Sequence, residues 1–352
     1  MDLLERVRLI LRGGSVIDWY RLGFERRGEV TEFLRANGYS VEHPGDADRV
    51  RDLLRMASQY LREDLDMEVP ADLADPVDLA APFLAASSRE RGDAAREHQR
   101  TACILLKIVH TINHLEAREL RLGLALSELE VFARVEMRVQ DAMADLVADG
   151  QRIIQFDMSR KTRDSTITKL LSKRRATAAQ ILDRLRFRVI VAERRDLPVV
   201  IAAMTRALVP YNYAIPEEST NDLIDFARFA RSIPQAAPWL GDLQFRLELE
   251  REDPLGRDIN ECSADEFRMI NFVADIPVRV DDALALAQHA HLRHLGRVVF
   301  LNAEFQIYDQ ATWASNERNA AASHDAYKER QRDRVKERLY EGLERLYGAA
   351  EK

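Results

Sequence analysis

Residues 186–191 read RFRVIV, and this stretch decides the fold class of the second half of the chain. Its density of β-branched and apolar residues predicts a strand. Residues 243–249 read LQFRLEL and alternate between apolar and polar side chains, as a half-buried strand does. Residues 267–280 and 297–307 are also strand-like. The second half of the chain is therefore expected to contain a β-sheet.

Helical stretches lie between these strands, at residues 197–208 and 281–290. Strands interleaved with helices predict a mixed β-sheet flanked by helices, which is an α+β fold. The charged tail, residues 325–347, predicts a long C-terminal helix with one apolar stripe. The stripe consists of Val335, Leu339, Leu343 and Leu346. It would pack on the body of the protein or on a partner helix, which leaves a homo-oligomer open.

Residues 1–150 are predicted to be almost wholly helical and to form a domain of their own, followed by a second domain over residues 151–352. Ser127 opens the sequence SELE, which has the form of a helix capping box with Glu130. The clearest helices are expected at residues 48–62, at residues 89–122 and from Ser127 onward.

The composition restricts the class of protein. The 352 residues are 46% hydrophobic and 32% charged, as in a globular chain of one large or two ordinary domains. The net charge of −7 argues against a nucleic-acid coat or a basic membrane-surface protein. Two cysteines without a C-x-x-C pair exclude zinc ribbons and fit the cytoplasm. The apolar runs are too short to span a membrane, and the N-terminus does not read as a signal peptide.

Lysines are concentrated in one segment. Arginine supplies most of the 52 basic residues, yet Lys161, Lys169 and Lys173 lie close together, with Arg163 and Ser165 between them. An ammonium group is a compact charge suited to phosphate. If Ser165 caps a helix, free backbone amides would converge on the same spot. The segment therefore predicts a phosphate site, and a solvated basic helix end is the alternative.

Two carboxylates are placed at predicted strands. Asp183 lies at the mouth of the first strand, and Glu304 lies inside the apolar strand at 297–307. If the two strands are neighbours, both carboxylates can hold one Mg²⁺ ion and activate a hydroxyl group. The alternatives are a turn acid paired with an arginine for Asp183 and an edge strand with its polar face in water for Glu304.

Residue spacing predicts which side chains share a face of the sheet. Arg186 and Arg188 are two residues apart, and so are Glu304 and Gln306. Each pair therefore lies on one face of its strand. A carboxylate in an apolar strand is uncommon unless it is paired or functional.

These elements, in this order, resemble the synthetase domain of the RelA/SpoT alarmone synthetases over about residues 155–330. The basic motif of that family has the form R-x-K-x-x-x-S-x-x-x-K. Lys161, Ser165 and Lys169 match its K, S and K at the family's spacing, and Ser159 stands at the place of its first arginine.

The strand motifs of the family are matched next. Asp183 and Arg188 match its aspartate and its strand arginine, whereas Arg186 replaces a glycine. Glu304 and Gln306 match the E-x-Q motif. The later W-A and helix motifs are matched by Trp313, Ala314, His324, Tyr327 and Lys328.

The nucleotide-acceptor motif Y-x-S-x-H differs most from the family. Phe267 replaces the tyrosine and can still stack on a base. Met269 and Asn271 replace the serine and the histidine.

The resemblance implies an Mg²⁺-dependent pyrophosphokinase that moves pyrophosphate from ATP to a ribose hydroxyl of a nucleotide or an RNA end. Asp183 and Glu304 would hold the metal, with Glu304 and Arg188 in catalysis. The implied ATP and nucleotide ligands are Lys161, Arg163, Ser165, Lys169, Lys173, Phe267 and Gln306. The altered acceptor motif supports a second hypothesis, a nucleotide-binding regulatory protein without catalysis. In a third hypothesis, the helical half docks on a partner protein.

One face of the long helix at 89–122 carries Lys107, His110, His114, Arg118 and Arg121 at steps of three and four residues. His110 and His114 have the spacing of a zinc-binding pair, but the sequence is not H-E-x-x-H and no third ligand is obvious. We expect this face to be solvated, with packing on the catalytic domain as the alternative.

Overall fold

A computed structural model gives the structure of the chain. The described part consists of Val7, Ile10 and residues 23–90, 92–124, 126–172, 184–210, 213–215, 218–225, 228–229, 268–318 and 324–348. Of these, residues 169, 172, 324–327 and 341–348 are described by their backbone alone. Lys173, Asp183, Phe267 and the predicted strand at 243–249 lie outside the described residues.

The chain divides into two compact units, each assembled from several stretches of sequence. Unit 1 comprises Met1–Gln151, Ile201–Pro216 and Ala274–Leu301. Unit 2 comprises Arg152–Val200, Glu217–Val273 and Asn302–Lys352. Most of the predicted helical region therefore lies in unit 1, together with two later segments.

Unit 1 is mainly helical in its described part. Its first helices are α2 (Arg27–Ala36), α3 (Pro44–Leu65), α4 (Ala71–Ala74), α5 (Ala81–Ala86), α6 (Asp93–Gly123) and α7 (Glu128–Ala148). The helices predicted at 48–62, at 89–122 and from Ser127 are confirmed as α3, α6 and α7. The capping box is present, because the Ser127 hydroxyl accepts from the Glu130 amide at 3.2 Å and the Glu130 carboxylate accepts from the Ser127 amide at 2.8 Å.

Three phenylalanine rings mark the core of unit 1. Phe24, Phe33 of α2 and Phe83 of α5 have ring centroids 5.3 to 6.1 Å apart. Buried aliphatic side chains of α3 and α6 belong to the same cluster. Farther along the chain, the helix predicted at 281–290 is split. Leu286 adopts an extended backbone, which separates α12 (Asp281–Ala285) from the 3₁₀ helix η6 (Ala287–Leu295).

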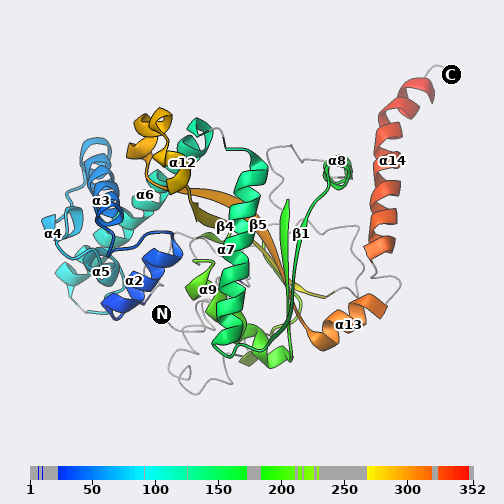
Figure 1. Cartoon of the computed structure of the whole chain (residues 1–352), viewed down its shortest axis with the longest axis horizontal. Helices are drawn as coiled ribbons and strands as arrows, with labels where there is room; N and C mark the ends of the chain where they lie inside the picture. Colours follow the sequence, from blue (N-terminus) through cyan, green and yellow to red (C-terminus); the bar gives the residue numbers. More distant parts are fainter. Residues whose placement is uncertain are drawn as a thin grey trace. The chain divides into compact units, whose positions relative to one another are not determined.

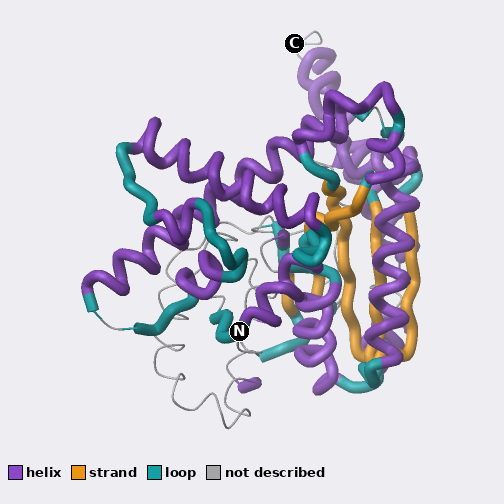
Figure 2. The backbone as a smooth tube through the Cα atoms, turned by 60° about the vertical axis from the view of Figure 1, so that its left-hand side comes forward, coloured by secondary structure: helices purple, strands orange, loops and turns teal. Residues whose placement is uncertain are grey.

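The strands form one five-stranded sheet in the order β1-β2-β5-β4-β3. Figure 2 shows strands lying side by side in orange. They are β1 (Ile153–Arg160), β2 (Leu185–Val191), β3 (Thr220–Asn221), β4 (Ile270–Arg279) and β5 (Val298–Asp309). β2 pairs antiparallel with β1 and parallel with β5, and β3 pairs antiparallel with β4. The sheet is therefore mixed, and the predicted α+β class is confirmed.

Strand prediction was incomplete at the edge of the sheet. The strands predicted at 186–191, 267–280 and 297–307 correspond to β2, β4 and β5. The edge strand β1 was not predicted. Residues 154–159 alternate between apolar and polar side chains, but none of the eight residues of β1 is buried, so the strand has no fully buried face. Its strand form depends on pairing with β2.

A row of four stacked phenylalanine rings crosses the unit 2 part of the sheet. Phe156 of β1, Phe187 of β2, Phe305 of β5 and Phe272 of β4 have neighbouring ring centroids 6.0, 5.3 and 5.1 Å apart. Phe187 and Phe305 are fully buried. Because side chains alternate along a strand, this aromatic face leaves the intervening residues on the opposite face.

The remaining described helices of unit 2 lie around the ends of its strands. They are α8 (Arg163–Ser172), the 3₁₀ helix η3 (Arg194–Asp196), the start of α9 (Leu197–Ala207), α13 (Gln310–Arg318) and α14 (His324–Gly348). α13 follows β5 directly, and α14 packs beside α8 (Figure 1). Arg338 of α14 donates a hydrogen bond to the Leu171 carbonyl of α8. No helix in the described ranges combines the length and apolar character needed to cross a membrane.

Candidate functional site

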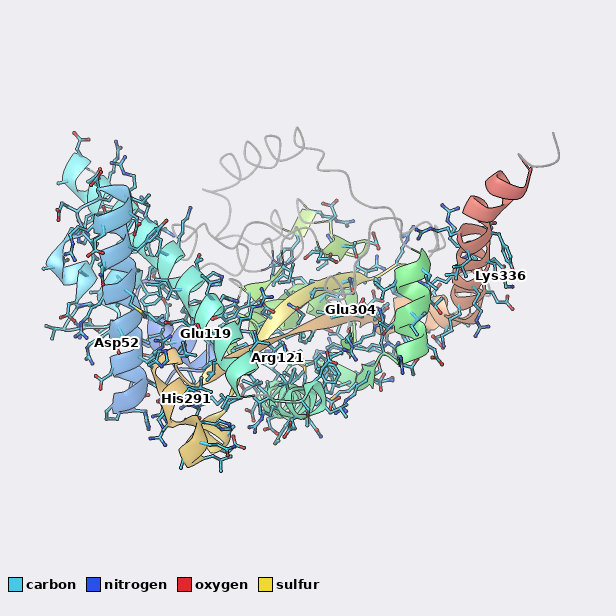
Figure 3. All side chains as sticks on the ribbon, turned by 90° about the horizontal axis from the view of Figure 1, so that it is seen from above. Asp52, Glu119, Arg121, His291, Glu304 and Lys336 are labelled. Carbon is cyan, nitrogen blue, oxygen red and sulfur yellow. The ribbon has the colours of Figure 1, made fainter. Side chains whose placement is uncertain are left out.

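The face of the sheet opposite the phenylalanine row carries a buried ion pair. The parallel register of β2 and β5 places Arg186 directly beside Glu304. Arg186 Nε donates to Glu304 Oε2 at 2.6 Å. Glu304 is 7% exposed, so its charge lies away from water, and Figure 3 shows its position on β5. A buried carboxylate needs such a partner, because an unpaired charge is costly to bury.

A chain of side chains on β5 leads away from this ion pair. Gln306 Nε2 donates to Glu304 Oε1 at 3.4 Å, and the Tyr308 hydroxyl donates to Gln306 Oε1 at 3.4 Å. The Tyr308 hydroxyl also lies 3.4 Å from the sulfur of Met269. Burial raises the pKa of the Tyr308 phenol above its usual range, so the phenol stays a donor. The two carboxylate oxygens of Glu304 therefore have separate donors.

Arg188 lies next to this pair on the same face. The residue it faces on β5 is Gln306, and its guanidinium lies 4.3 Å from the centre of the Trp313 ring. Its closest carboxylate oxygen belongs to Asp157 of β1, at 3.8 Å from Nη1. Within the described residues, its buried Nε has no hydrogen-bond partner. Arg188 is thus held by stacking, with donor capacity left over.

The start of α13 fixes the position of Trp313. Asp309, the last residue of β5, accepts from the Thr312 amide at 3.0 Å and from the Thr312 hydroxyl at 2.7 Å. Arg194 also donates to Asp309, at 3.3 Å. Burial alone would raise the pKa of the Asp309 carboxyl, but the bonds from Thr312 and Arg194 bring it below its usual range. A charged cap at a helix N-terminus is stabilising, so the first turn of α13 holds the backbone of Trp313 in place.

Exposure rises steadily across the polar face from β5 to β1. The exposed side-chain fraction is 9% for Glu304, 21% for Arg186, 31% for Arg188 and 43% for Asp157. The two arginines therefore lie between a buried carboxylate and the solvent. A ligand that approaches this face meets guanidinium groups before it meets Glu304.

Lys161, the first lysine of the lysine-rich segment, connects this segment to the start of β2 by a backbone hydrogen bond. The Lys161 amide donates to the Arg184 carbonyl at 2.8 Å, which ties the end of β1 to the start of β2. The predicted cap at Ser165 is wrong. α8 begins at Arg163, and the Ser165 amide donates to the hydroxyl of Thr162 at 3.2 Å, so Thr162 is the capping residue. Arg163 is exposed in this first turn.

Several predicted ligands have no described side chain. Lys169 lies on α8, where only its backbone is described. Lys173, Asp183 and Phe267 lie outside the described residues. The acceptor-motif residues that follow Phe267 are described, and within this part of the chain Asn271 Oδ1 is buried without a hydrogen-bond partner. Of the predicted residues, the structure brings together Glu304, Gln306 and Arg188.

The sequence analysis gave three residues of this face no role in the site. Arg186 was read as a departure from the family motif, whereas it pairs with Glu304. Asp157 lies on the strand that was not predicted. Trp313 was matched as a motif without a role, and its contact with Arg188 depends on the α13 cap. The signal that could have found Arg186 was its shared face with Arg188.

The histidine face of α6, in unit 1, is not solvated as predicted. The His110 ring stacks on Tyr213 at 5.5 Å, and the His114 ring stacks on Phe300 at 4.2 Å. His114 Nδ1 lies 3.7 Å from Asp275 Oδ2. Burial lowers the pKa of His110 to about 3 and that of His114 to about 4. The described residues contain no group of three or more histidine, cysteine or acidic side chains arranged to hold a metal.

No family model and no curated protein matches the sequence. Among solved structures, the chain is similar to small alarmone synthetase 2 from Bacillus subtilis, with 15% identity and a TM-score of 0.31 over 64% of this chain and 97% of that one. It is similar to small alarmone synthetase 1 from Bacillus subtilis bound to its product pppGpp, with 13% identity and a TM-score of 0.29 over 62% and 92% of the two chains. A GTP pyrophosphokinase family protein from Streptococcus pneumoniae gives 14% identity and a TM-score of 0.29 over 67% and 92%.

These solved structures are alarmone synthetases and a GTP pyrophosphokinase family protein, and the order of the sequence motifs resembles the alarmone synthetases.

Proposed function

We propose that unit 2 is a nucleotide pyrophosphokinase-like domain that binds ATP, and a second nucleotide or an RNA end, on the polar face of its sheet. The observation that carries this proposal is the row formed by Glu304, Arg186 and Arg188. The Arg188 guanidinium lies over the Trp313 ring, 4.3 Å from its centre. Guanidinium forks bind phosphate oxygens, and a carboxylate beside them can take a proton.

The proposed transfer needs little covalent chemistry from the protein. The acceptor hydroxyl oxygen forms a bond to the β-phosphorus of ATP, the bond to the α-phosphate oxygen breaks, and AMP leaves. The hydroxyl proton passes to Glu304. Arg186, Arg188 and Lys161 neutralise the phosphates, since phosphoryl transfer depends mostly on positioning and charge stabilisation. Arg163, Ser165, Lys169 and Lys173 would add phosphate contacts, and Phe267 a stacking surface.

The described residues do not fit the Mg²⁺ ion that the resemblance implies. Mg²⁺ requires several hard oxygen donors in a near-octahedral arrangement. Glu304 Oε2 already accepts from Arg186, and Oε1 accepts from Gln306. Asp183, the second predicted ligand, lies outside the described residues. We therefore propose no step through a metal ion, and the transfer described above uses side chains of the protein.

A second candidate function is nucleotide binding without transfer. The observation that favours it is the 2.6 Å bond from Arg186 to Glu304, because this bond already occupies one oxygen of the carboxylate that would take the hydroxyl proton. In this case the arginines would still bind phosphate, and Glu304 would serve to hold Arg186 in place.

The experiment that separates the two candidates is a label-transfer assay. The purified protein is incubated with γ-labelled ATP, and GTP, GDP, ATP, ADP or bulk tRNA is offered as acceptor, with Mg²⁺ and with EDTA. Wild type is compared with Glu304→Gln and with Glu329→Gln, an exposed residue of α14 that serves as the control. Transfer that is lost only in Glu304→Gln supports the enzyme. Transfer that survives in Glu304→Gln refutes the role of Glu304, and ATP binding without transfer in wild type favours the second candidate.

A further inference from the structure

We propose that the guanidinium of Arg186 takes the place of a divalent cation beside Glu304, so that the polar face binds nucleotide polyphosphates without a metal. This inference rests on the nucleotide site proposed above and specifies how that site meets its ligand. It concerns binding alone and applies to both candidate functions.

The backbone fixes Arg186 next to Glu304. The two residues are direct partners in the parallel register of β2 and β5, where β2 is an inner strand of the sheet. The side chains of such partners point to the same face. The 2.6 Å bond joins two side chains that are 21% and 9% exposed. Moving Arg186 away would break a buried ion pair, which is strongly unfavourable.

Charge at the site also opposes a metal. Glu304 contributes one negative charge, and Arg186 already neutralises it. A divalent ion beside Glu304 would be repelled by the guanidinium, and repulsion of this kind is strong where water is largely excluded. Within the part of the chain that the structure describes, no cluster of three acidic, histidine or cysteine side chains offers an alternative metal site.

The donors of Arg186 are divided between Glu304 and the open side of the face. Nε is the donor used toward Glu304, and no described residue accepts a hydrogen bond from either terminal amino group. A guanidinium carries five N–H donors in a rigid fork, so the terminal groups remain for a ligand. In Arg188, Nη1 lies 3.8 Å from Asp157 Oδ2 on the more exposed side of the face, and Nε is buried without a hydrogen-bond partner among the described residues.

Two such forks on one strand fit an extended phosphate chain. Arg186 and Arg188 are separated by one residue, so their backbones are about 6.6 Å apart along β2. Each fork can bind the oxygens of a different phosphate group. Glu304 orients the first fork and Trp313 supports the second. A polyphosphate would therefore accept from donors that no described residue uses.

The test is calorimetric titration of the full chain with ATP and with GTP, in EDTA and in Mg²⁺. For wild type, we expect the dissociation constants in the two buffers to agree within about threefold. Arg186→Ala should weaken binding in EDTA by about ten- to a hundredfold, the range for a lost hydrogen bond to a charged group. Arg195→Ala is the control, because Arg195 is 73% exposed and pairs with Glu193.

A second variant guards against misfolding. Arg186→Ala removes the guanidinium that Glu304 pairs with on β2, whereas the double variant Arg186→Ala/Glu304→Gln removes both charges and should fold, with the same loss of binding in EDTA. Wild-type binding that requires Mg²⁺, or a double variant that folds and binds as wild type does in EDTA, overturns the inference and leaves the nucleotide site standing. If neither nucleotide binds in either buffer, the proposed function fails and the inference fails with it.

Discussion

The two faces of the unit 2 sheet come from the same strands, and a shift of one residue separates their chemistry. On one face, Phe187 lies beside Phe305 in a row of stacked rings. On the other, Arg186 lies beside Glu304 in an ion pair. Phe187, Phe305 and Glu304 are all buried, but only the polar face keeps hydrogen-bond donors that no described residue uses. Burial alone therefore does not show that a side chain serves only the core. The aromatic face should contribute most to the free energy of unfolding, and the polar face should determine nucleotide affinity.

The largest effect is expected on the aromatic face. Phe305→Ala removes a fully buried ring that contacts both Phe187 and Phe272. The free energy of unfolding should fall by about 3–5 kcal/mol, measured by urea denaturation. Met158→Ala is the matched control, because Met158 is 40% exposed, and it should cost less than about 1 kcal/mol. Equal costs for the two variants would contradict a stabilising role for the ring row.

A smaller loss of stability is expected from breaking the ion pair on the polar face. Arg186→Ala should lower the free energy of unfolding by about 3 kcal/mol, because it removes the guanidinium from a buried ion pair. Glu304→Gln should cost less, since its amide oxygen can still accept from Arg186. Denaturation of both single variants and of the double variant measures the coupling between the two residues. Additive effects would show that the pair is not coupled.

The buried histidines of unit 1, His110 and His114, should affect the pH dependence of stability and not nucleotide binding. Burial lowers the pKa of His110 to about 3 and that of His114 to about 4, so the folded state excludes protons that the unfolded state binds below about pH 6.5. The contribution of these histidines to the free energy of unfolding should therefore be fully present above pH 6.5, and it should be lost progressively as the pH drops toward 4. Each histidine contributes at most about 1.4 kcal/mol per pH unit.

His114→Gln isolates this contribution, because glutamine does not titrate. Between pH 6 and pH 4.5, the slope of stability against pH should become shallower than in wild type. ATP affinity should not change, because the ring contacts of His114, to Tyr213 and Phe300, involve no residue of the polar face. An unchanged slope would show that His114 is not a buried neutral histidine.

The smallest effect is expected at the edge of the polar face. Trp313→Leu removes the ring on which Arg188 lies at 4.3 Å. The affinity for ATP should fall by about 0.5–1 kcal/mol, the value of an exposed cation–π contact. Calorimetry measures the change, and Tyr340→Leu on α14, where Tyr340 is 60% exposed, is the control. Equal affinities in the two variants would remove Trp313 from the site.

The sequence predicted those parts of the fold that depend on local pattern. RFRVIV placed β2 correctly, and SELE placed the start of α7, because alternation and capping involve residues within a few positions of one another. The shared faces of Arg186 with Arg188 and of Glu304 with Gln306 also followed from spacing alone.

The parts that were missed depend on contacts between distant segments. Arg186 and Glu304 are 118 residues apart, and spacing within a strand does not fix the register between strands. The face of α6 was read as solvated because the residues that bury His114, such as Phe300, come from a remote part of the chain. The capping residue of α8 was placed at Ser165 instead of Thr162, since both are good caps and three residues separate them.

The most direct test of the polar face as a nucleotide site uses Trp313 as a reporter. The chain has three tryptophans, and Trp19→Phe/Trp239→Phe leaves Trp313 as the only one. Titration of this variant with ATP in EDTA should change its fluorescence to saturation, with the dissociation constant that calorimetry gives. The same titration with Arg188→Ala added should give a much weaker response. If calorimetry detects ATP binding while the emission of Trp313 stays constant, the nucleotide binds elsewhere and the account of the polar face is wrong.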